Sequence, residues 1–177
     1  MPSTTAPTLT TPRLTLRPHR LDDFESCVEL WQDPVVTRFT TVKPLSQQEI
    51  WSRLLRNPGH WALLGFGYWV VEERASGRFM GEVGQSRFRR EILSAHPELD
   101  EVPEAGWVLL PWAHGQGYAQ EAVAAALAWR DAELPGYKTF CIISPGNEAS
   151  LRLAGRMGFV ANGSVGQGDD AVTLFLR

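Results

Sequence analysis

The sequence predicts an α/β domain in which helices flank a mixed sheet. In the second half of the chain, short apolar stretches alternate with stretches of helical periodicity, which is typical of strand–helix–strand units. In the first half, strand-like stretches at 68–73 and 79–85 flank a short link ending in Gly77, which predicts a hairpin. No repeat or domain boundary interrupts the 177 residues, so we expect a flexible tail over 1–12 and one domain over 13–177.

The composition is that of a globular protein and argues against several classes of partner. Hydrophobic residues make up 44% of the chain and charged residues 21%, while the net charge of -3 offers no basic surface for nucleic acid. No apolar run approaches the roughly 20 residues that span a bilayer. We therefore expect a cytoplasmic protein without nucleic-acid or membrane partners. Cys27, Cys141 and the four histidines lack metal-ligand spacing, so we predict no metal site.

The first elements follow from apolar periodicity. Leu14 and Leu16 alternate with polar residues, which predicts a half-buried strand, and residues 22–33 place apolar side chains on one helical face. Ser46 and Glu49 form a capping box that begins a second helix, expected to end at 57–59, the Asn-Pro-Gly sequence. The polar connection 86–103 is too long for a simple turn and is expected to be functional or mobile.

The centre of the chain predicts an anion site. Residues 104–110 read as a buried strand, and the alanine-rich residues after Gly117 read as a helix that ends before Pro135. The first N–H groups of such a helix lack partners within it and lie at the positive end of its dipole. Neither a Walker loop nor a dinucleotide G-x-G-x-x-G motif is present. A strand at 139–144, a helix capped by Asn147 and a final hairpin complete the chain.

Several ordered motifs together resemble the GNAT acetyltransferase superfamily, and most closely its ribosomal-protein N-terminal alanine acetyltransferases. The motifs are TPRLTLRP, WQDPVVTRF, RFMGEVG, EAGWVLLPWAHGQGYAQEA and NEASLRLAGRMGF, which extend over nearly the whole chain. The resemblance implies a mostly antiparallel sheet of about six to seven strands whose central strands splay apart.

The same resemblance implies where coenzyme A binds. The family's phosphate loop reads Q/R-x-x-G-x-G/A, and HGQGYA matches it at Gly117 and Ala119, with His114 at the Gln/Arg position. Main-chain N–H groups of this loop would hold the diphosphate, and main-chain groups of the preceding strand would pair with the pantetheine arm. The implied coenzyme-binding residues are Leu109, Leu110, His114, Gly115, Gln116, Gly117, Tyr118, Ala119 and Asn147.

Three residues are candidates for proton transfer. Glu104 stands where related enzymes place a carboxylate facing the acceptor amine, which must lose a proton before it attacks. Asp169, with its neighbour Asp170, competes for this role because it has the family's spacing from Ser150. Ser150 is implied as the donor to the departing thiolate, since the tyrosine that many members use is Ala154 here. The alternatives are an exposed strand-end glutamate for Glu104, a solvated turn for Asp169 and Asp170, and no dedicated proton donor in place of Ser150. For Asn147 the alternative is a plain helix cap.

The resemblance implies an acetyl-CoA-dependent N-acetyltransferase that passes the acetyl group directly to a primary amine. The acceptor would be a small molecule or a peptide or protein N-terminus, and the acidic residues between 98 and 104 suggest that it is cationic. Aromatic residues of GHWALLGFGYW, among them Trp61, Phe66 and Tyr68, are expected near the acceptor. Dimers are common among relatives, so a homodimer is allowed. The alternative from another class is a catalytically idle coenzyme A-binding sensor or scaffold module.

Overall fold

One open sheet organises the molecule. The computed structural model describes residues 4–41 and 43–177, and every side chain in these ranges except that of Asp169. Eight strands form the order β1-β2-β3-β4-β5-β6-β8-β7, and all neighbours are antiparallel except β5 and β6. The strands are β1 (Leu9–Thr10), β2 (Leu14–Arg17), β3 (Tyr68–Glu73), β4 (Phe79–Ser86), β5 (Glu104–Leu109), β6 (Phe140–Ile143), β7 (Val160–Val165) and β8 (Val172–Leu176).

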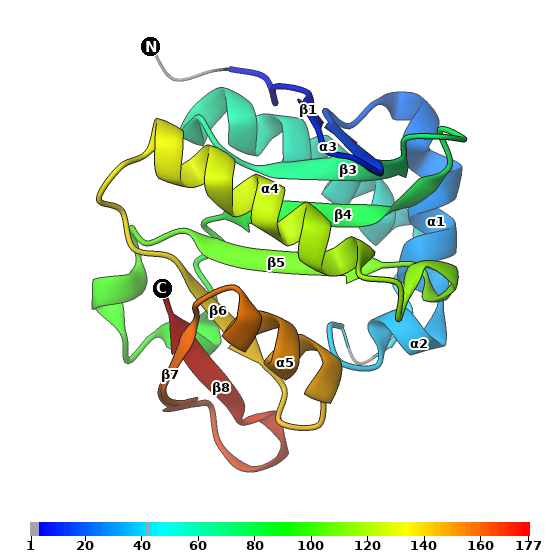
Figure 1. Ribbon diagram of the computed structural model, residues 1–177. Coiled ribbons are helices and arrows are strands. Elements are labelled where there is room, and N and C mark those ends of the chain that lie inside the picture. The colour runs from blue at the N-terminus through cyan, green and yellow to red at the C-terminus, as the bar shows by residue number, and fades with distance from the viewer. Residues whose placement is uncertain (1–3, 42) are drawn as a thin grey trace.

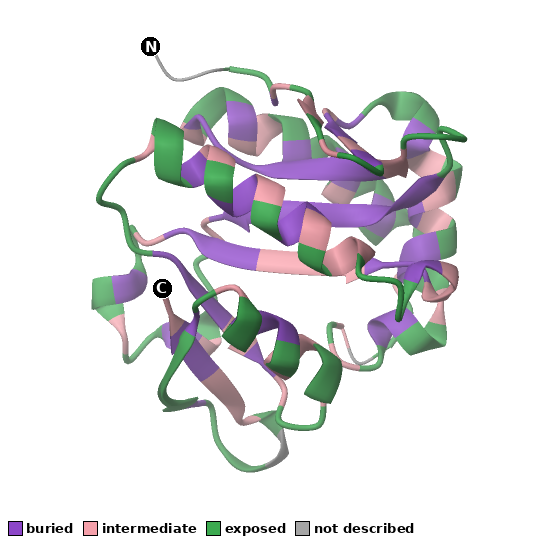
Figure 2. Cartoon of the chain, in the orientation of Figure 1, coloured by how far each residue is buried: buried purple, intermediate pink, exposed green. Residues whose placement is uncertain are grey.

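The helices cover both faces of this sheet, with α4 across one face and α3 behind the other (Figure 1). They are α1 (Phe24–Gln32), α2 (Pro34–Thr37), α3 (Gln47–Leu64), α4 (Tyr118–Glu133) and α5 (Glu148–Arg156). Alternation along β3 divides the core: Trp69 and Val71 pack with α4, whereas Val70 packs with α1 and α3. Both faces of β3 and β4 are therefore buried, as Figure 2 shows. The predicted α/β class is confirmed, with a slightly larger sheet than expected.

The extra strand comes from the segment expected to be a mobile tail. Residues 1–3 lie outside the described residues, but from Ala6 onward the chain lies against the core, and this differs from the prediction. Ala6 is buried, the Trp69 Nε1–H donates to the Pro7 carbonyl at 2.8 Å, and β1 pairs with β2. These contacts give a Thr- and Pro-rich segment enough partners to be held in place, which its composition alone does not indicate.

Helix α3 is longer than predicted. Its capping box is confirmed, since the Glu49 N–H donates to Ser46 Oγ and the Ser46 N–H to Glu49 Oε2. The helix continues through Pro58 and ends at Gly65, whose φ of 76° gives a left-handed cap. A proline inside a helix costs about 3 kcal/mol. The last turn nevertheless buries Trp61 in edge-on contact with Trp69, a gain comparable to that cost.

The long connection between β4 and β5 is packed as well. It forms two 3₁₀ turns, Glu91–Leu93 and Pro97–Leu99, which bury Leu93 and Leu99 beside Phe140 of β6. Arg87 and Arg89 form ion pairs with Glu101, and Arg89 also with Asp100, beside this small cluster.

A half-buried histidine on α3, His60, makes stability depend on pH. Ser86 Oγ donates to His60 Nδ1 at 2.7 Å, and burial, aided by Arg56 and Arg53, lowers the pKa of His60 to about 4. An unfolded histidine takes up a proton near pH 6.5. Between these values the unfolded state binds more protons, so the free energy of unfolding should fall as the pH decreases from about 6.5 to about 4. Urea unfolding at several pH values should show a flatter profile for His60→Gln.

His96→Gln provides the control, because His96 lies at the surface beside Glu98 and no comparable burial acts on it. Equal pH profiles for wild type and His60→Gln would contradict this account.

Candidate functional site

Two clefts meet where β5 and β6 separate. Strand β5 pairs with β4 from Glu104 to Leu109, but with β6 only at the Glu104–Phe140 position. A cleft of about 460 Å³ lies toward the start of α4 and α5, and a second of about 230 Å³ lies toward α1, α3 and β3. Both are lined by Phe39, Thr40, Trp107, Val108, Asn147 and Ser150. We call them the loop cleft and the acceptor cleft.

The predicted anion loop borders the loop cleft. Gly115 and Gly117 have φ of 72° and 80°, conformations that side-chain-bearing residues rarely adopt. The first intrahelical bond of α4 runs from the Glu121 N–H to the Gly117 carbonyl at 3.1 Å. The N–H groups of residues 118–120 therefore lack partners within the helix. His114, Gly115, Gly117 and Ala119 line the cleft, so main-chain donors and the helix dipole converge there.

Two predicted loop residues contribute main chain rather than side chain. The Gln116 side chain donates to the Trp112 carbonyl at 2.7 Å, and the Tyr118 hydroxyl donates to Glu73 Oε1 at 3.1 Å. Neither residue lines the loop cleft. Their side chains instead fix the loop to the 3₁₀ turn before it and to β3.

The N-terminal segment braces the same loop. Arg13 forms an ion pair with Glu121 at 2.7 Å and donates to the Gln116 carbonyl at 2.9 Å. Thr11 also donates to Glu121, at 2.6 Å. Hydrogen bonding from these groups lowers the pKa of Glu121 although burial opposes its charge, so the carboxylate stays ionised. Glu121, expected to be structural, thus ties α4 to the start of β2.

The main-chain N–H and C=O groups of β5 point alternately toward β4 and toward the gap between β5 and β6. The Leu110 N–H donates to the Met80 carbonyl at 2.7 Å, so the antiparallel alternation directs the main-chain groups of Trp107 and Leu109 toward the gap. His114 Nε2–H donates to the Leu109 carbonyl at 2.8 Å, so the Leu109 N–H is the group of this residue that can bind a ligand in the gap. Leu110 lies in the α1–α3 core and lines neither cleft. The structure therefore does not bring Leu110 to the site that the sequence predicts for it.

Asn147 and Ser150 lie at the junction of the two clefts. Asn147 Oδ1 accepts from the Ser150 N–H at 3.2 Å, which confirms the predicted cap of α5. Trp107 Nε1–H donates to Ser150 Oγ at 3.1 Å. Because the indole occupies a lone pair of the hydroxyl, the serine keeps its own hydrogen to donate. The sequence does not reveal this contact with the hydroxyl, since no motif pairs residues 107 and 150.

Glu104 is buried rather than exposed. Its side chain is 6% exposed and accepts two bonds from Arg90 Nε, at 2.9 and 2.7 Å. This hydrogen bonding raises the pKa of Arg90, although burial alone would lower it. Both residues line the acceptor cleft. Glu104 thus lines the acceptor cleft as one half of an ion pair.

Tyr68 reaches the same cleft across two strands. It is opposite Gly84 on β4, which is opposite Gly106 on β5, so the three share one face of the sheet. A Cβ at Gly106 would overlap the Tyr68 hydroxyl. Burial, and the nearby Glu104, raise the pKa of Tyr68, so its hydroxyl remains a neutral donor. Of the three aromatic residues singled out from the sequence, only Tyr68 lines the cleft.

Other candidates take less central positions. The side chain of Asp169 lies outside the described residues, and its turn, Gly168–Asp170, precedes Val172, which lines the acceptor cleft. Arg152 and Arg156 of α5 line the loop cleft and supply positive charge that the sequence analysis did not assign. Within the described residues, no group of three or more His, Cys, Asp or Glu is arranged to hold a metal ion. Nor does any helix in that part of the chain have the length and apolarity needed to cross a membrane.

Comparisons with known proteins agree with this geometry. Residues 13–160 match the family model described as an acetyltransferase (GNAT) domain. A solved structure from Bordetella pertussis, assigned to the GnaT acetyltransferase family, is 30% identical, with a TM-score of 0.84 over 97% of this chain and 99% of that one. The Bacillus subtilis protein YkkB is 28% identical over 149 residues, 84% of this chain and 81% of YkkB.

A more distant structure shares the fold. RimL, the ribosomal L7/L12 α-N-protein acetyltransferase solved in complex with coenzyme A, is 14% identical and superposes with a TM-score of 0.76 over 97% of each chain. The residues present also fit the coenzyme, because an anion-binding helix start and two arginines border one cleft. The chain belongs to the GNAT acetyltransferase family and is an acetyl-CoA-dependent N-acyltransferase.

Proposed function

We propose that this protein transfers an acetyl group from acetyl-CoA directly to a primary amine of a small molecule or of a protein N-terminus. The observation that carries the proposal is the junction at Trp107 and Ser150, where the loop cleft opens into the acceptor cleft. A donor held on one side of the sheet and an amine held on the other would meet there. Main-chain amides of residues 115–119, with Arg152 and Arg156, would hold the diphosphate end.

Each residue at the junction has a distinct part. Bound acetyl-CoA supplies the thioester carbonyl. The Leu109 N–H, directed toward the gap, can stabilise negative charge on the carbonyl oxygen. Glu104 accepts the proton that the amine gives up as the C–N bond forms, and Ser150 donates a proton to the sulfur as the C–S bond breaks.

Direct transfer is supported by the state of the nearest thiol. Cys141 lines the acceptor cleft, but it is 1% exposed, and burial raises its pKa. A protonated, buried thiol is a poor nucleophile, so an acetyl-cysteine intermediate is disfavoured.

The proposal is tested by incubating the protein with acetyl-CoA and a panel of amines, amino acids and N-terminal peptides. We expect thiol release and a mass increase of one acetyl group on the amine. Thermal stabilisation by acetyl-CoA without transfer to any amine would contradict the proposal and favour a coenzyme-binding module.

Removal of the proposed base should have a moderate effect. We expect Glu104→Gln to lower kcat/KM by about tenfold at pH 7, below the usual range for a general base, because Arg90 Nε already engages both carboxylate oxygens. The loss should shrink above the amine's own pKa, which is about 8 for an α-amino group. Parallel pH–rate profiles of wild type and variant would exclude Glu104 as the base.

A further inference from the structure

The acidic residues between 98 and 104 present no unpaired carboxylate to the acceptor cleft. The four acids between 98 and 104 are each paired with a basic side chain at 3.1 Å or less, and this removes the basis for expecting a cationic acceptor. The pairs are Glu98 with His96, Asp100 with Arg89, Glu101 with Arg87 and Arg89, and Glu104 with Arg90.

Arg53 of α3 is the remaining charged residue that lines the acceptor cleft. Its guanidinium lies over the Trp31 ring, 3.8 Å from the ring centroid, and its Nε is buried with no hydrogen-bond partner. The Arg53 Nε to Glu82 Oε2 distance is 3.8 Å, too long for a hydrogen bond. Arg53 is thus held in place by an aromatic ring and an ion pair, and its guanidinium forms no hydrogen bond within the described part of the chain.

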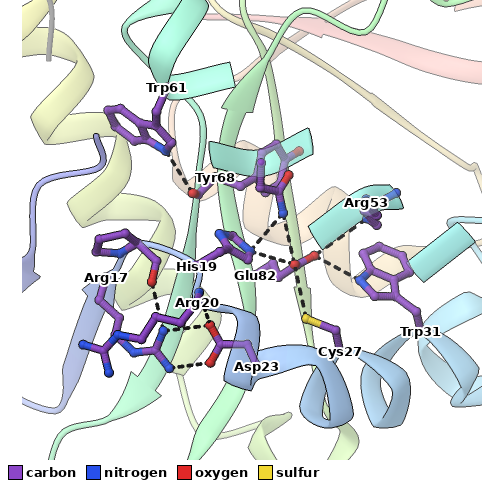
Figure 3. Close-up of polar contacts among 12 residues, drawn as sticks. Arg17, His19, Arg20, Asp23, Cys27, Trp31, Arg53, Trp61, Tyr68 and Glu82 are labelled. Atoms are coloured by element: carbon purple, nitrogen blue, oxygen red, sulfur yellow. Dashed lines mark hydrogen bonds and ion pairs between the residues drawn. The ribbon is translucent and has the colours of Figure 1, made fainter. Parts of the chain in front are cut away.

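Other groups supply the hydrogen bonds of Glu82, and its contact with Arg53 is a longer ion pair (Figure 3). Its carboxylate accepts from Trp31 Nε1 at 3.0 Å and Asn57 Nδ2 at 3.2 Å, and His19 Nε2 lies at 2.8 Å. Burial opposes its charge, but the contact with His19 and the other donors lower the pKa of Glu82 below its ordinary value. Glu82 therefore attracts Arg53 electrostatically but accepts no hydrogen bond from its guanidinium.

A second arginine, Arg56, extends the positive charge of Arg53 beyond the acceptor cleft. Arg56 lies one helical turn after Arg53 and forms no hydrogen bond to a carboxylate in the described part of the chain. Arg56 is exposed, and its guanidinium lies over the Phe88 ring, 5.3 Å from the ring centroid. Arg53 and Arg56 line an outer groove whose acid, Glu49, is engaged by the α3 cap. Arg53 and Thr41 border both this groove and the acceptor cleft.

We propose that the acceptor is a primary amine that carries a carboxylate, and that the guanidinium of Arg53 binds the carboxylate while the amine lies toward Glu104. This inference rests on the proposed function and names its substrate class. The planar guanidinium suits carboxylate recognition through paired N–H donors, and its position over Trp31 limits the orientations it can take. Arg56 would serve acceptors whose acidic groups extend into the outer groove.

The test compares matched pairs of acceptors that differ only in negative charge. One arm uses α-amino acids and their carboxamides; the other uses an N-terminal tetrapeptide amide with two aspartates and its counterpart with two asparagines. The arms separate a free amino acid from an acidic N-terminus. For each pair we measure the ratio of kcat/KM values in wild type, Arg53→Met, Arg53→Lys and Arg20→Met. Arg20 is exposed and lines neither cleft, so it controls for loss of one positive charge.

We expect wild type and Arg20→Met to favour the anionic member of a pair by about tenfold, the value of one charged hydrogen bond. Arg53→Met should abolish the preference, measured as the ratio within each pair, and Arg53→Lys should restore part of it. Equal rates for both members in wild type, or a preference that survives Arg53→Met, would overturn the inference and leave amine acetylation intact. Absence of transfer to every amine would remove the proposed function and this inference together.

Discussion

Replacing Gly117 by valine should weaken coenzyme A binding by about 100-fold or more, since several charge-assisted hydrogen bonds would be lost together. Gly117 has a φ of 80°, and a Cβ there would lie 3.4 Å from an Arg13 guanidinium nitrogen. A β-branched residue is strongly disfavoured in this conformation, so the backbone would turn to negative φ and rotate the following N–H groups away from the cleft. Isothermal calorimetry with coenzyme A measures the effect.

Gly136→Val is the matched control. Gly136 has a φ of 83° and no heavy atom within 4 Å of its Cβ position, and it follows the far end of α4. It should therefore incur similar backbone strain, visible as a lower Tm, while coenzyme A binds as in wild type. If Gly117→Val bound coenzyme A with wild-type affinity, the loop would not be the anion site.

Replacing Ser150 by alanine should reduce kcat by about 100-fold, the lower end of the range for general acid catalysis, because a thiolate leaves fairly well without a proton. Affinity for acetyl-CoA should stay nearly unchanged, since the cap from Asn147 uses the Ser150 N–H and not its side chain. Single-turnover rates and separate binding measurements distinguish the two quantities.

Trp107→Phe refines the assignment. It removes the Nε1–H that donates to Ser150 Oγ but keeps an aromatic ring at the junction. If the indole positions the hydroxyl, this variant should have a kcat between those of wild type and Ser150→Ala. Unchanged turnover in Ser150→Ala would refute the donor role.

Local sequence patterns were sufficient to predict features whose geometry is determined within a single helix or turn. The capping box at Ser46, the cap at Asn147 and the glycines of the loop before α4 all lie within a few residues of the groups they satisfy, so the sequence predicts them directly. The splayed strands and the family came from the combined resemblance of several motifs.

Features that depend on contacts between distant segments could not be predicted in this way. Pro58 indicates a helix end, yet the burial of Trp61 against β3 carries α3 onward. Tyr68 reaches Gly106 only because three strands align in register. The acids near Glu104 suggest a negative surface, but arginines of the same connection neutralise them and leave Arg53, about 50 residues earlier, as the available charge.

A crystal structure of the protein with coenzyme A tests the central claim most directly. The account predicts the diphosphate within hydrogen-bond distance of the main-chain amides of residues 117–119, and the sulfur at the junction beside Ser150. A diphosphate bound away from the start of α4, or a sulfur remote from Trp107 and Ser150, would contradict it.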